Sequence, residues 1–311
     1  MDGNKSSAGP PGLSDTQQMM YAFGDFRRPN PDSARIVEQV VLAQLRTIIH
    51  LATNLAENRG SKILIIEDIL YLMRKSPIKI QRLIQYLKIK DKKDELSLLE
   101  KGETWERQLK TTVRCRNFLE KIDETGVLLA ACDKEHYDEV YHERLVRHDR
   151  ITKNLDERKY LDFCKARRVS FRGKYSQWFQ SSLQDVVDTL DIKLEKLTND
   201  VICYLAYETL GQLIELCLVV RRDSSFNSVD KLNRLLPIQS INTAFPNLAV
   251  PVRDKNEGIK NSDYSGCPLT PAEVREAVRR LQDGERTRTM FGGRKSLHGL
   301  QPEPNVPLLA I

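Results

Sequence analysis

Residues 198–222 read TNDVICYLAYETLGQLIELCLVVRR, and this stretch constrains the fold more than any other part of the chain. As a single helix it would be about 37 Å long. Apolar side chains surround most of its circumference, and a helix of that kind cannot face water. These side chains belong to Val201, Ile202, Leu205, Leu213, Ile214, Leu216, Leu218, Val219 and Val220.

Polar residues argue against placing this stretch in a membrane. They interrupt it before it reaches the roughly 18 uninterrupted apolar residues of a membrane span. The interrupting residues are Asp200, Glu208, Gln212 and Glu215. We therefore expect the helix to have protein, and not lipid, on several sides.

The composition is that of a soluble protein with a core. Of 311 residues, 40% are hydrophobic and 30% are charged, and the mean hydropathy is −0.46. This length allows two domains or one interrupted domain. Residues 1–13 have neither the basic nor the apolar region of a signal peptide, so we expect a disordered tail and a nuclear or cytosolic protein. The net charge of +6 permits an acidic partner without requiring one.

The six cysteines are scattered and include no CxxC pair. They are Cys115, Cys132, Cys164, Cys203, Cys217 and Cys267. Two of them fall in the apolar helix, so buried free thiols are the favoured interpretation.

The first part of the chain shows a short helix, a long helix and another short helix. Residues 14–23 predict a helix capped by Ser14 or Asp15, and residues 33–59 predict a long helix that Ser33 caps and Gly60 ends. The β-branched patch at 62–66 precedes a third helix at 67–76. This order is typical of a histone fold.

A further helix is predicted after Pro77, completing a first copy at 14–93. Between Arg74 and Lys93, eight basic residues accompany one acid, Asp91. The sequence leaves two interpretations open, a solvated basic face or contact with nucleic acid or an acidic partner.

The same helix order recurs at 174–283. Residues 175–183 predict a short helix, the apolar stretch is the long one, and Thr270 with Glu273 forms a capping box for a third that runs to Gly284. The charged segment 94–173 is interpreted as a helical connector, with one helix at 109–131 interrupted at Gly126. Residues 224–266 are interpreted as a largely disordered insertion and 284–311 as a tail.

Two copies in one chain predict an all-α fold in which they pair. A lone histone fold leaves apolar surface bare on its long helix, and a second copy crossing it head to tail would bury that surface. Covering about 800 Å² on each long helix would contribute about 40 kcal/mol before entropy is subtracted. Because the connector holds the copies close together, an intramolecular pair is expected, with Val41 and Leu213 in one globule.

The residues also resemble a known family. The chain is similar to the suppressor-of-Ty transcription initiation factors, the subunits of the SAGA coactivator that carry two histone folds in one polypeptide. The first copy resembles the smallest histone-fold TBP-associated factor of TFIID at Met19, Met20, Tyr21, Gly24, Asp25, Arg27, Arg28, Pro29, Val40, Val41, Glu67, Asp68, Met73, Arg74 and Lys75. The second resembles that factor's partner at Tyr204, Leu205, Ala206, Tyr207, Glu208, Thr209, Gln212, Leu213, Arg275, Glu276, Ala277, Arg279 and Arg280.

The connector favours SAGA over TFIID, since the two TFIID proteins are separate chains. It resembles the family's middle region at Phe118, Leu119, Ile122, Asp123, Thr125, Gly126, Leu129, Ala130, Asp138, Glu139, Val140, Glu143, Arg144, Tyr160, Phe163, Cys164, Arg167, Ser170 and Phe171. The resemblance implies a nuclear scaffold that docks among other SAGA subunits, including histone-fold proteins, and contacts the TATA-binding protein at RNA polymerase II promoters. It implies no membrane, no small-molecule substrate and only indirect contact with DNA.

Three departures from the family pattern carry structural expectations. Ile65 and Ile66 replace a Thr-Pro pair, so a cap worth about 1 kcal/mol is missing from the third helix. Lys62 occupies the position of an arginine that faces Asp68, which predicts a weaker clamp. The first loop of the second copy is longer than expected, and its path is not predicted.

No motif for catalysis, cofactor binding or metal binding emerges from the sequence. His136, His142 and His148 recur every six residues, which turns successive side chains about 600° around a helix and away from one another. Residues 292–296, GGRKS, lack the spacing of a phosphate-binding loop. Trp178 and Tyr207 are interpreted as core residues. The chain is thus predicted to be a non-enzymatic coactivator subunit; a histone-like DNA-binding protein and a TFIID subunit are the alternatives.

Overall fold

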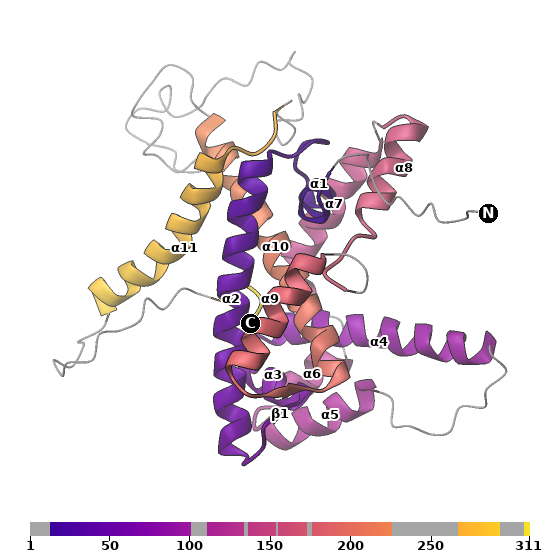
Figure 1. Cartoon of the computed structure of the whole chain (residues 1–311), viewed down its shortest axis with the longest axis vertical. Helices are drawn as coiled ribbons and strands as arrows, with labels where there is room; N and C mark the ends of the chain where they lie inside the picture. Colours follow the sequence, from indigo (N-terminus) through magenta and orange to yellow (C-terminus); the bar gives the residue numbers. More distant parts are fainter. Residues whose placement is uncertain are drawn as a thin grey trace, which may run out of the picture. The chain divides into compact units, whose positions relative to one another are not determined.

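The structure is a computed structural model, and the all-α class predicted from the sequence is confirmed (Figure 1). It describes residues 13–100, 111–133, 136–153, 155–172, 176–225, 267–292 and 308–311. The chain forms two compact units. Unit 1 comprises Met1–Gln39, Ile151–Val169 and Leu210–Pro307, and unit 2 comprises Val40–Arg150, Ser170–Thr209 and Leu308–Ile311.

The helices predicted for the first copy are present. They are α1 (Asp15–Phe23), α2 (Pro31–Asn58), α3 (Ile66–Met73) and α4 (Pro77–Glu100), with strand β1 (Ile63–Leu64) before α3. Ser14 caps α1 as predicted, because its Oγ accepts from the N–H of Gln17 at 3.2 Å, and Gly24 ends the helix in a left-handed conformation. The predicted cap of α2 is wrong: Asn30 Oδ1 accepts the N–H of Asp32 at 2.8 Å.

The connector is helical, and it contributes to both units. Its helices are α5 (Thr111–Ile122), α6 (Val127–Asp133), α7 (Glu139–Lys153) and α8 (Glu157–Ala166). The predicted interruption at Gly126 is confirmed, since this glycine has a φ of 75° between α5 and α6. Cys115 and Leu119 of α5 are fully buried in unit 2, so this part of the connector belongs to the core.

The second copy's helices are also present. They are α9 (Gln177–Thr189), α10 (Lys196–Ser225) and α11 (Pro271–Gly292), with strand β2 (Lys193–Leu194) between α9 and α10. The capping box at Thr270 is confirmed, because Glu273 Oε2 accepts the N–H of Thr270 at 2.7 Å and Thr270 Oγ1 accepts the N–H of Glu273 at 3.3 Å. The proposed insertion lies outside the described residues from 226 onward.

The interpretation of 284–311 as a tail is wrong in two places. Helix α11 continues past Gly284 to Gly292, since one glycine within a helix costs only about 1 kcal/mol. Leu309 and Ala310 are buried in unit 2, because they supply apolar side chains that pack against the core.

Unit 1 packs the first short helix against the connector. Tyr21 of α1 meets Phe163 of α8 edge to face, with ring centroids 5.3 Å apart, in the part of the unit where Figure 1 shows α1 beside α8. On α10, Gly211 allows close approach of Phe23, whose ring would lie 2.5 Å from a Cβ at that position. A side chain there would displace a fully buried phenyl ring.

Unit 2 is built around a pairing of two short strands. β1 and β2 run parallel, with Ile63 opposite Lys193 and Leu64 opposite Leu194. The N–H of Lys193 donates to the Lys62 carbonyl at 2.8 Å. This pairing gives the first loop of the second copy a defined path. Helices α4, α5 and α6 pack together in the same unit (Figure 1).

Each unit takes one end of each long helix. Unit 1 holds the beginning of α2 and the end of α10, and unit 2 holds the remainder of both. Val41 and Leu213 therefore fall in different units, and the expectation that they share a globule is wrong. Head-to-tail pairing brings the beginning of one helix to the end of the other, which is the combination found in unit 1.

The apolar helix α10 passes a test of length and composition for a membrane span. Residues Lys196–Asp223 include a window with a hydropathy of 1.4, yet 72% of that window is buried within the protein. The polar residues that interrupt this stretch do not lower the mean hydropathy of the window below that of a membrane span. Burial gives these apolar side chains a protein environment, as expected for a core helix.

Candidate protein-interaction surface

The described residues gather no constellation for metal-dependent chemistry. Among them, no three His, Cys, Asp or Glu side chains lie close enough together to hold a metal ion. Of the three regularly spaced histidines, His142 packs against Tyr137, with ring centroids 5.6 Å apart. The proposed phosphate-loop resemblance falls at the end of α11, and residues 293–296 lie outside the described part of the chain.

Four of the six cysteines are buried, as predicted. Cys115, Cys132, Cys203 and Cys217 are buried free thiols, whereas Cys164 is half-buried and Cys267 is exposed. Burial raises the pKa of Cys115 to about 12, and nearby Glu67 raises it further. This thiol stays protonated at neutral pH and is a poor nucleophile.

A buried ionic network in unit 2 fixes helix α7. Arg144 of α7 donates to Glu208 of α10 at 3.0 Å, and Arg82 of α4 donates to Asp138 at 2.7 Å. Asp138 Oδ1 also accepts the N–H of Tyr141 at 3.0 Å and so caps α7. Burial raises the pKa of Asp138, but the bonds from Arg82 and Tyr141 outweigh it and hold the pKa below its usual range.

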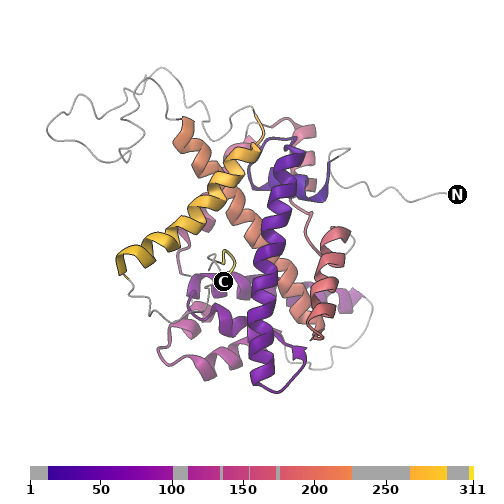
Figure 2. The same cartoon turned by 60° about the vertical axis from the view of Figure 1, so that its left-hand side comes forward.

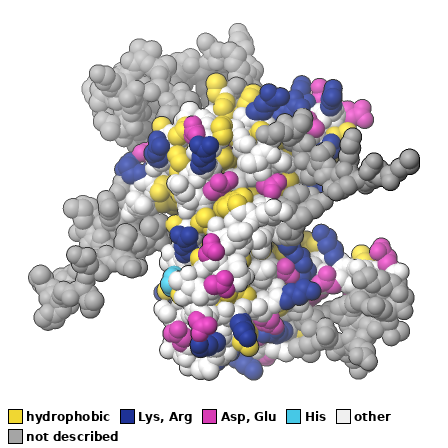
Figure 3. All heavy atoms as spheres, viewed as in Figure 1, with side chains coloured by type: hydrophobic (Ala, Val, Ile, Leu, Met, Phe, Trp, Pro, Cys, Tyr) yellow, Lys and Arg dark blue, Asp and Glu magenta, His cyan; other side chains and the backbone are white. Residues whose placement is uncertain are grey.

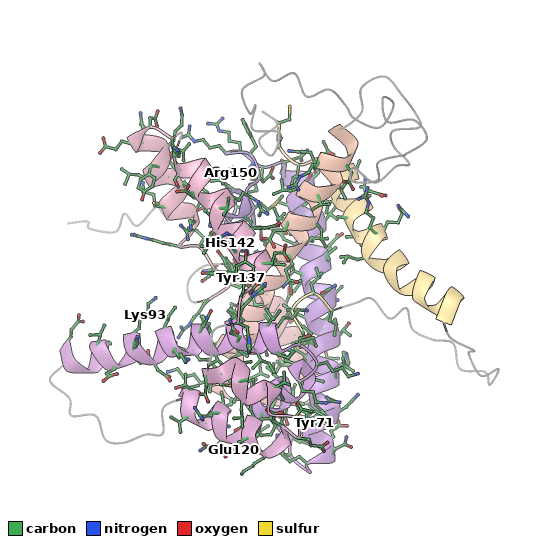
Figure 4. The ribbon with its side chains drawn as sticks, turned by 180° about the vertical axis from the view of Figure 1, so that it is seen from behind. Tyr71, Lys93, Glu120, Tyr137, His142 and Arg150 are labelled. Atoms are coloured by element: carbon green, nitrogen blue, oxygen red, sulfur yellow. The ribbon has the colours of Figure 1, made fainter. Side chains whose placement is uncertain are left out.

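Helix α7 and the segment just before it also expose apolar and aromatic side chains. We call this set, Tyr137, Val140, Tyr141 and Leu145, the α7 stripe. Tyr137 is 72% exposed and the other three are 43 to 48% exposed. Figure 4 shows Tyr137, which precedes α7, close to His142 of the helix. Tyr141 and Leu145 are four apart on α7 and share a helix face, and clustered exposed aromatic residues are typical of protein contact sites.

Arg114 of α5 connects the two paired loops of unit 2. It donates two bonds to Glu67 at the start of α3, at 2.6 and 2.7 Å. It also donates to Glu195, just before α10, at 2.6 and 3.2 Å. The bonds to both glutamates raise the pKa of Arg114, against a smaller opposing effect of burial. The connector thus supplies one side chain that holds both copies beside the strands β1 and β2.

Part of the basic stretch from Arg74 to Lys93 makes contacts inside unit 2. Arg82 takes part in the ionic network, Lys90 pairs with Asp200 at 2.6 Å, and Lys88 donates to the Cys132 carbonyl at 3.2 Å. On the face in Figure 3, basic and acidic side chains alternate without one continuous basic patch. Lys75, Lys92 and Lys93 are exposed, so both interpretations of this stretch stay open.

A polar seam in unit 1 joins the turn after α1 to the segment before α11. Asp25 Oδ1 accepts the N–H of Leu269 at 2.8 Å, and Ser33 donates to the Leu269 carbonyl at 2.7 Å. Arg221 of α10 donates to both oxygens of Glu273 at 2.7 and 2.8 Å. Burial raises the pKa of Asp25 to about 6, although two backbone N–H groups and Arg221 lower it in part.

Residues 13–98 match the family model described as "Transcription initiation factor IID, 18kD subunit". The chain is 26% identical over 303 residues to the SAGA complex subunit Spt3 of Schizosaccharomyces pombe, covering 91% of this chain and 92% of that protein. It is 28% identical over 228 residues to the Drosophila melanogaster Spt3, covering 72% of this chain and 56% of that protein's length.

The chain belongs to the Spt3 family. A shorter match, 32% identity over 75 residues, relates it to the transcription initiation factor TFIID subunit 13 of Dictyostelium discoideum. That match covers 24% of this chain and 69% of the Dictyostelium protein. The Spt3 matches extend through the connector, and the TFIID match does not.

In the first turn of α3, Asp68 does not have the partner that the family pattern predicts. Asp68 pairs with Arg59 at 2.8 Å, not with Lys62, which pairs with Asp191 instead. Arg59, which directly follows the end of α2, reaches the carboxylate instead, so the predicted weak lysine clamp is wrong. The missing cap is confirmed, because Ile65 supplies no side-chain bond at the start of α3.

Sequence reasoning missed the α7 stripe and the role of Arg114. Tyr141 and Leu145 follow helical spacing, so this part of the stripe was visible as a pattern. Nothing in the sequence shows which side of α7 is buried, since this depends on Arg144 reaching Glu208. In the sequence, Arg114 was likewise not distinguishable from the other arginines of the connector.

Proposed function

We propose that this Spt3-family chain is a non-enzymatic scaffold subunit of a SAGA-type coactivator complex. It acts in the nucleus, docks among other SAGA subunits, and contacts the TATA-binding protein to help deliver it to RNA polymerase II promoters. The match along 91% of the chain to a SAGA complex subunit supports this assignment. The scaffold role rests on contacts between proteins, for which the α7 stripe provides a surface.

The platform is an intramolecular pair of histone folds. The first fold spans 14–93 and the second 174–283, with the connector 94–173 between them. The parallel pairing of β1 with β2 is the observation that carries this proposal, because it joins the loop after α2 to the loop before α10. Arg114 supports it by binding Glu67 and Glu195 at the same junction. One chain then supplies both halves of a histone pair.

We assign the α7 stripe to the TATA-binding protein. A protein that binds DNA carries a basic surface, and the exposed carboxylates of Glu139 and Glu143 on α7 complement it. The apolar side chains between them would supply the desolvated centre of the contact. The same carboxylates would repel phosphates, which makes direct DNA binding by this face unfavourable.

A pull-down from nuclease-treated extract tests this proposal. Replacing Tyr137, Tyr141 and Leu145 with serine should lower capture of the TATA-binding protein at least tenfold, while SAGA subunits still co-purify. The matched control replaces Ile89 and Leu96 with serine, since both are exposed on α4, and should leave capture unchanged. Unaltered capture by the stripe variant would refute the assignment. Loss of SAGA subunits with retention of the TATA-binding protein would assign the stripe to complex assembly.

A TFIID subunit is the second candidate, favoured by the family match at residues 13–98. Affinity purification of the tagged chain distinguishes the two, because SAGA membership predicts acetyltransferase-complex components and TFIID membership predicts TFIID subunits. Filter binding to duplex DNA tests the histone-like alternative. Strong affinity with a steep salt dependence would support it.

A further inference from the structure

The last four described residues, Leu308–Ile311, form a short segment packed in unit 2. The N–H of Leu309 donates to Gln44 Oε1 of α2 at 2.9 Å. Lys79 Nζ of α4 donates to the main-chain oxygen of Ile311 at 2.9 Å. These two bonds connect residues separated by 265 and 232 positions in the sequence. Figure 2 shows this segment beside α2.

Both polar contacts are made to the main chain of the segment. Gln44 accepts an N–H and Lys79 donates to a main-chain oxygen, which is how extended peptides are recognised irrespective of their side chains. Gln44 is itself buried, and a buried amide needs hydrogen-bond partners. The segment provides one of them.

The side chains of the segment supply the apolar part of the contact. Leu309 is 8% exposed and Ala310 is 2% exposed. The site therefore buries an aliphatic side chain at the first position and a small one at the next. Lys79 stands at its other edge, where burial chiefly, and Arg82 secondarily, lower the pKa of its amine.

We propose that the surface around Gln44 and Lys79 is a peptide-binding site whose resident ligand is the chain's own Leu308–Ile311. The segment is covalently tethered, so a high local concentration, typically about millimolar, adds to the affinity that its own contacts supply. A free peptide with an aliphatic residue followed by a small one binds the same site when the resident segment leaves. The proposal is independent of SAGA membership and of the TATA-binding protein.

Peptide binding to a shortened chain tests the proposal. The probe is a fluorescein-labelled peptide of residues 305–311, NVPLLAI, added to the chain ending at Pro307 and to the full chain, and followed by fluorescence anisotropy. The shortened chain should bind the probe at least tenfold more tightly than the full chain, whose site is occupied. A probe carrying Leu309→Asp should bind at least tenfold more weakly, because burying a leucine contributes about tenfold or more in affinity.

A pair of variants on α2 locates the site. In the shortened chain, Gln44→Ala should weaken probe binding, and Thr47→Ala, at an exposed position one turn away, should not. Equal binding of the probe to both chains, or no binding to a folded shortened chain, overturns the proposal. Loss of cooperative thermal melting in the shortened chain also overturns it, because the segment would then be a permanent part of the core.

Discussion

Replacing Arg114 with alanine should destabilise the junction between the two copies. Breaking a fully buried ion pair costs about 3 to 5 kcal/mol, and breaking an exposed pair costs about 0 to 1 kcal/mol. The Arg114 side chain is 32% exposed and binds two carboxylates, so solvent screening places the loss between these limits, at about 2 kcal/mol. For a chain of this size, that loss lowers the melting temperature by about 4 to 8 °C.

The assay is thermal and urea unfolding followed by circular dichroism, with Arg116→Ala as the matched control. Arg116 lies on the same helix and pairs with Asp133, but the two side chains are 50% and 46% exposed, so its removal should cost under about 1 kcal/mol. Arg114→Lys should be intermediate, because one ammonium cannot make paired bonds to two carboxylates. An Arg114→Ala melting temperature equal to that of the control would refute the reasoning.

Three further predictions concern residues elsewhere. Leu213→Asp should abolish the cooperative melting transition, because Leu213 is fully buried and an unpaired buried charge costs several kcal/mol; Val219→Asp, at an exposed position on the same helix, should melt nearly normally. Gly211→Ala should destabilise by about 1 to 3 kcal/mol despite its better helix propensity, since the new methyl would overlap Phe23, and an equal or higher melting temperature would contradict the packing. The pKa of Asp25 is raised from 3.8 to about 6 in the folded chain, so stability should fall by up to about 3 kcal/mol as pH rises between these values. Urea unfolding at pH 4.5 and 7.5 should show that Asp25→Asn lacks this loss, and an unchanged pH dependence in the variant would count against it.

Patterns that repeat along the chain were predictable from the sequence. Helical spacing and end signals such as Ser14, Gly24 and Thr270 located the helices, because a cap acts on residues within one turn of itself. The resemblance of connector residues to one family gave the SAGA assignment. These inferences depend on short-range geometry or on many positions taken together.

Contacts between distant residues were not predictable in the same way. Arg59 and Lys62 are both basic and close to Asp68 in sequence, and only the path of the chain shows which one reaches the carboxylate. The burial of Leu309 likewise depends on a surface assembled from α2 and α4. In the sequence, a four-residue apolar end is indistinguishable from a tail.

Cross-linking within a single chain tests the proposed intramolecular pair most directly. Lys62 and Lys193 are exposed and their main chains are hydrogen-bonded at 2.8 Å, so an amine-reactive cross-linker should join them. Equal amounts of ¹⁴N- and ¹⁵N-labelled protein are mixed, cross-linked at low concentration and analysed by mass spectrometry. Pairing within one chain predicts Lys62–Lys193 links in which both peptides carry the same isotope. Links of mixed isotope, or no link between these lysines, would contradict it.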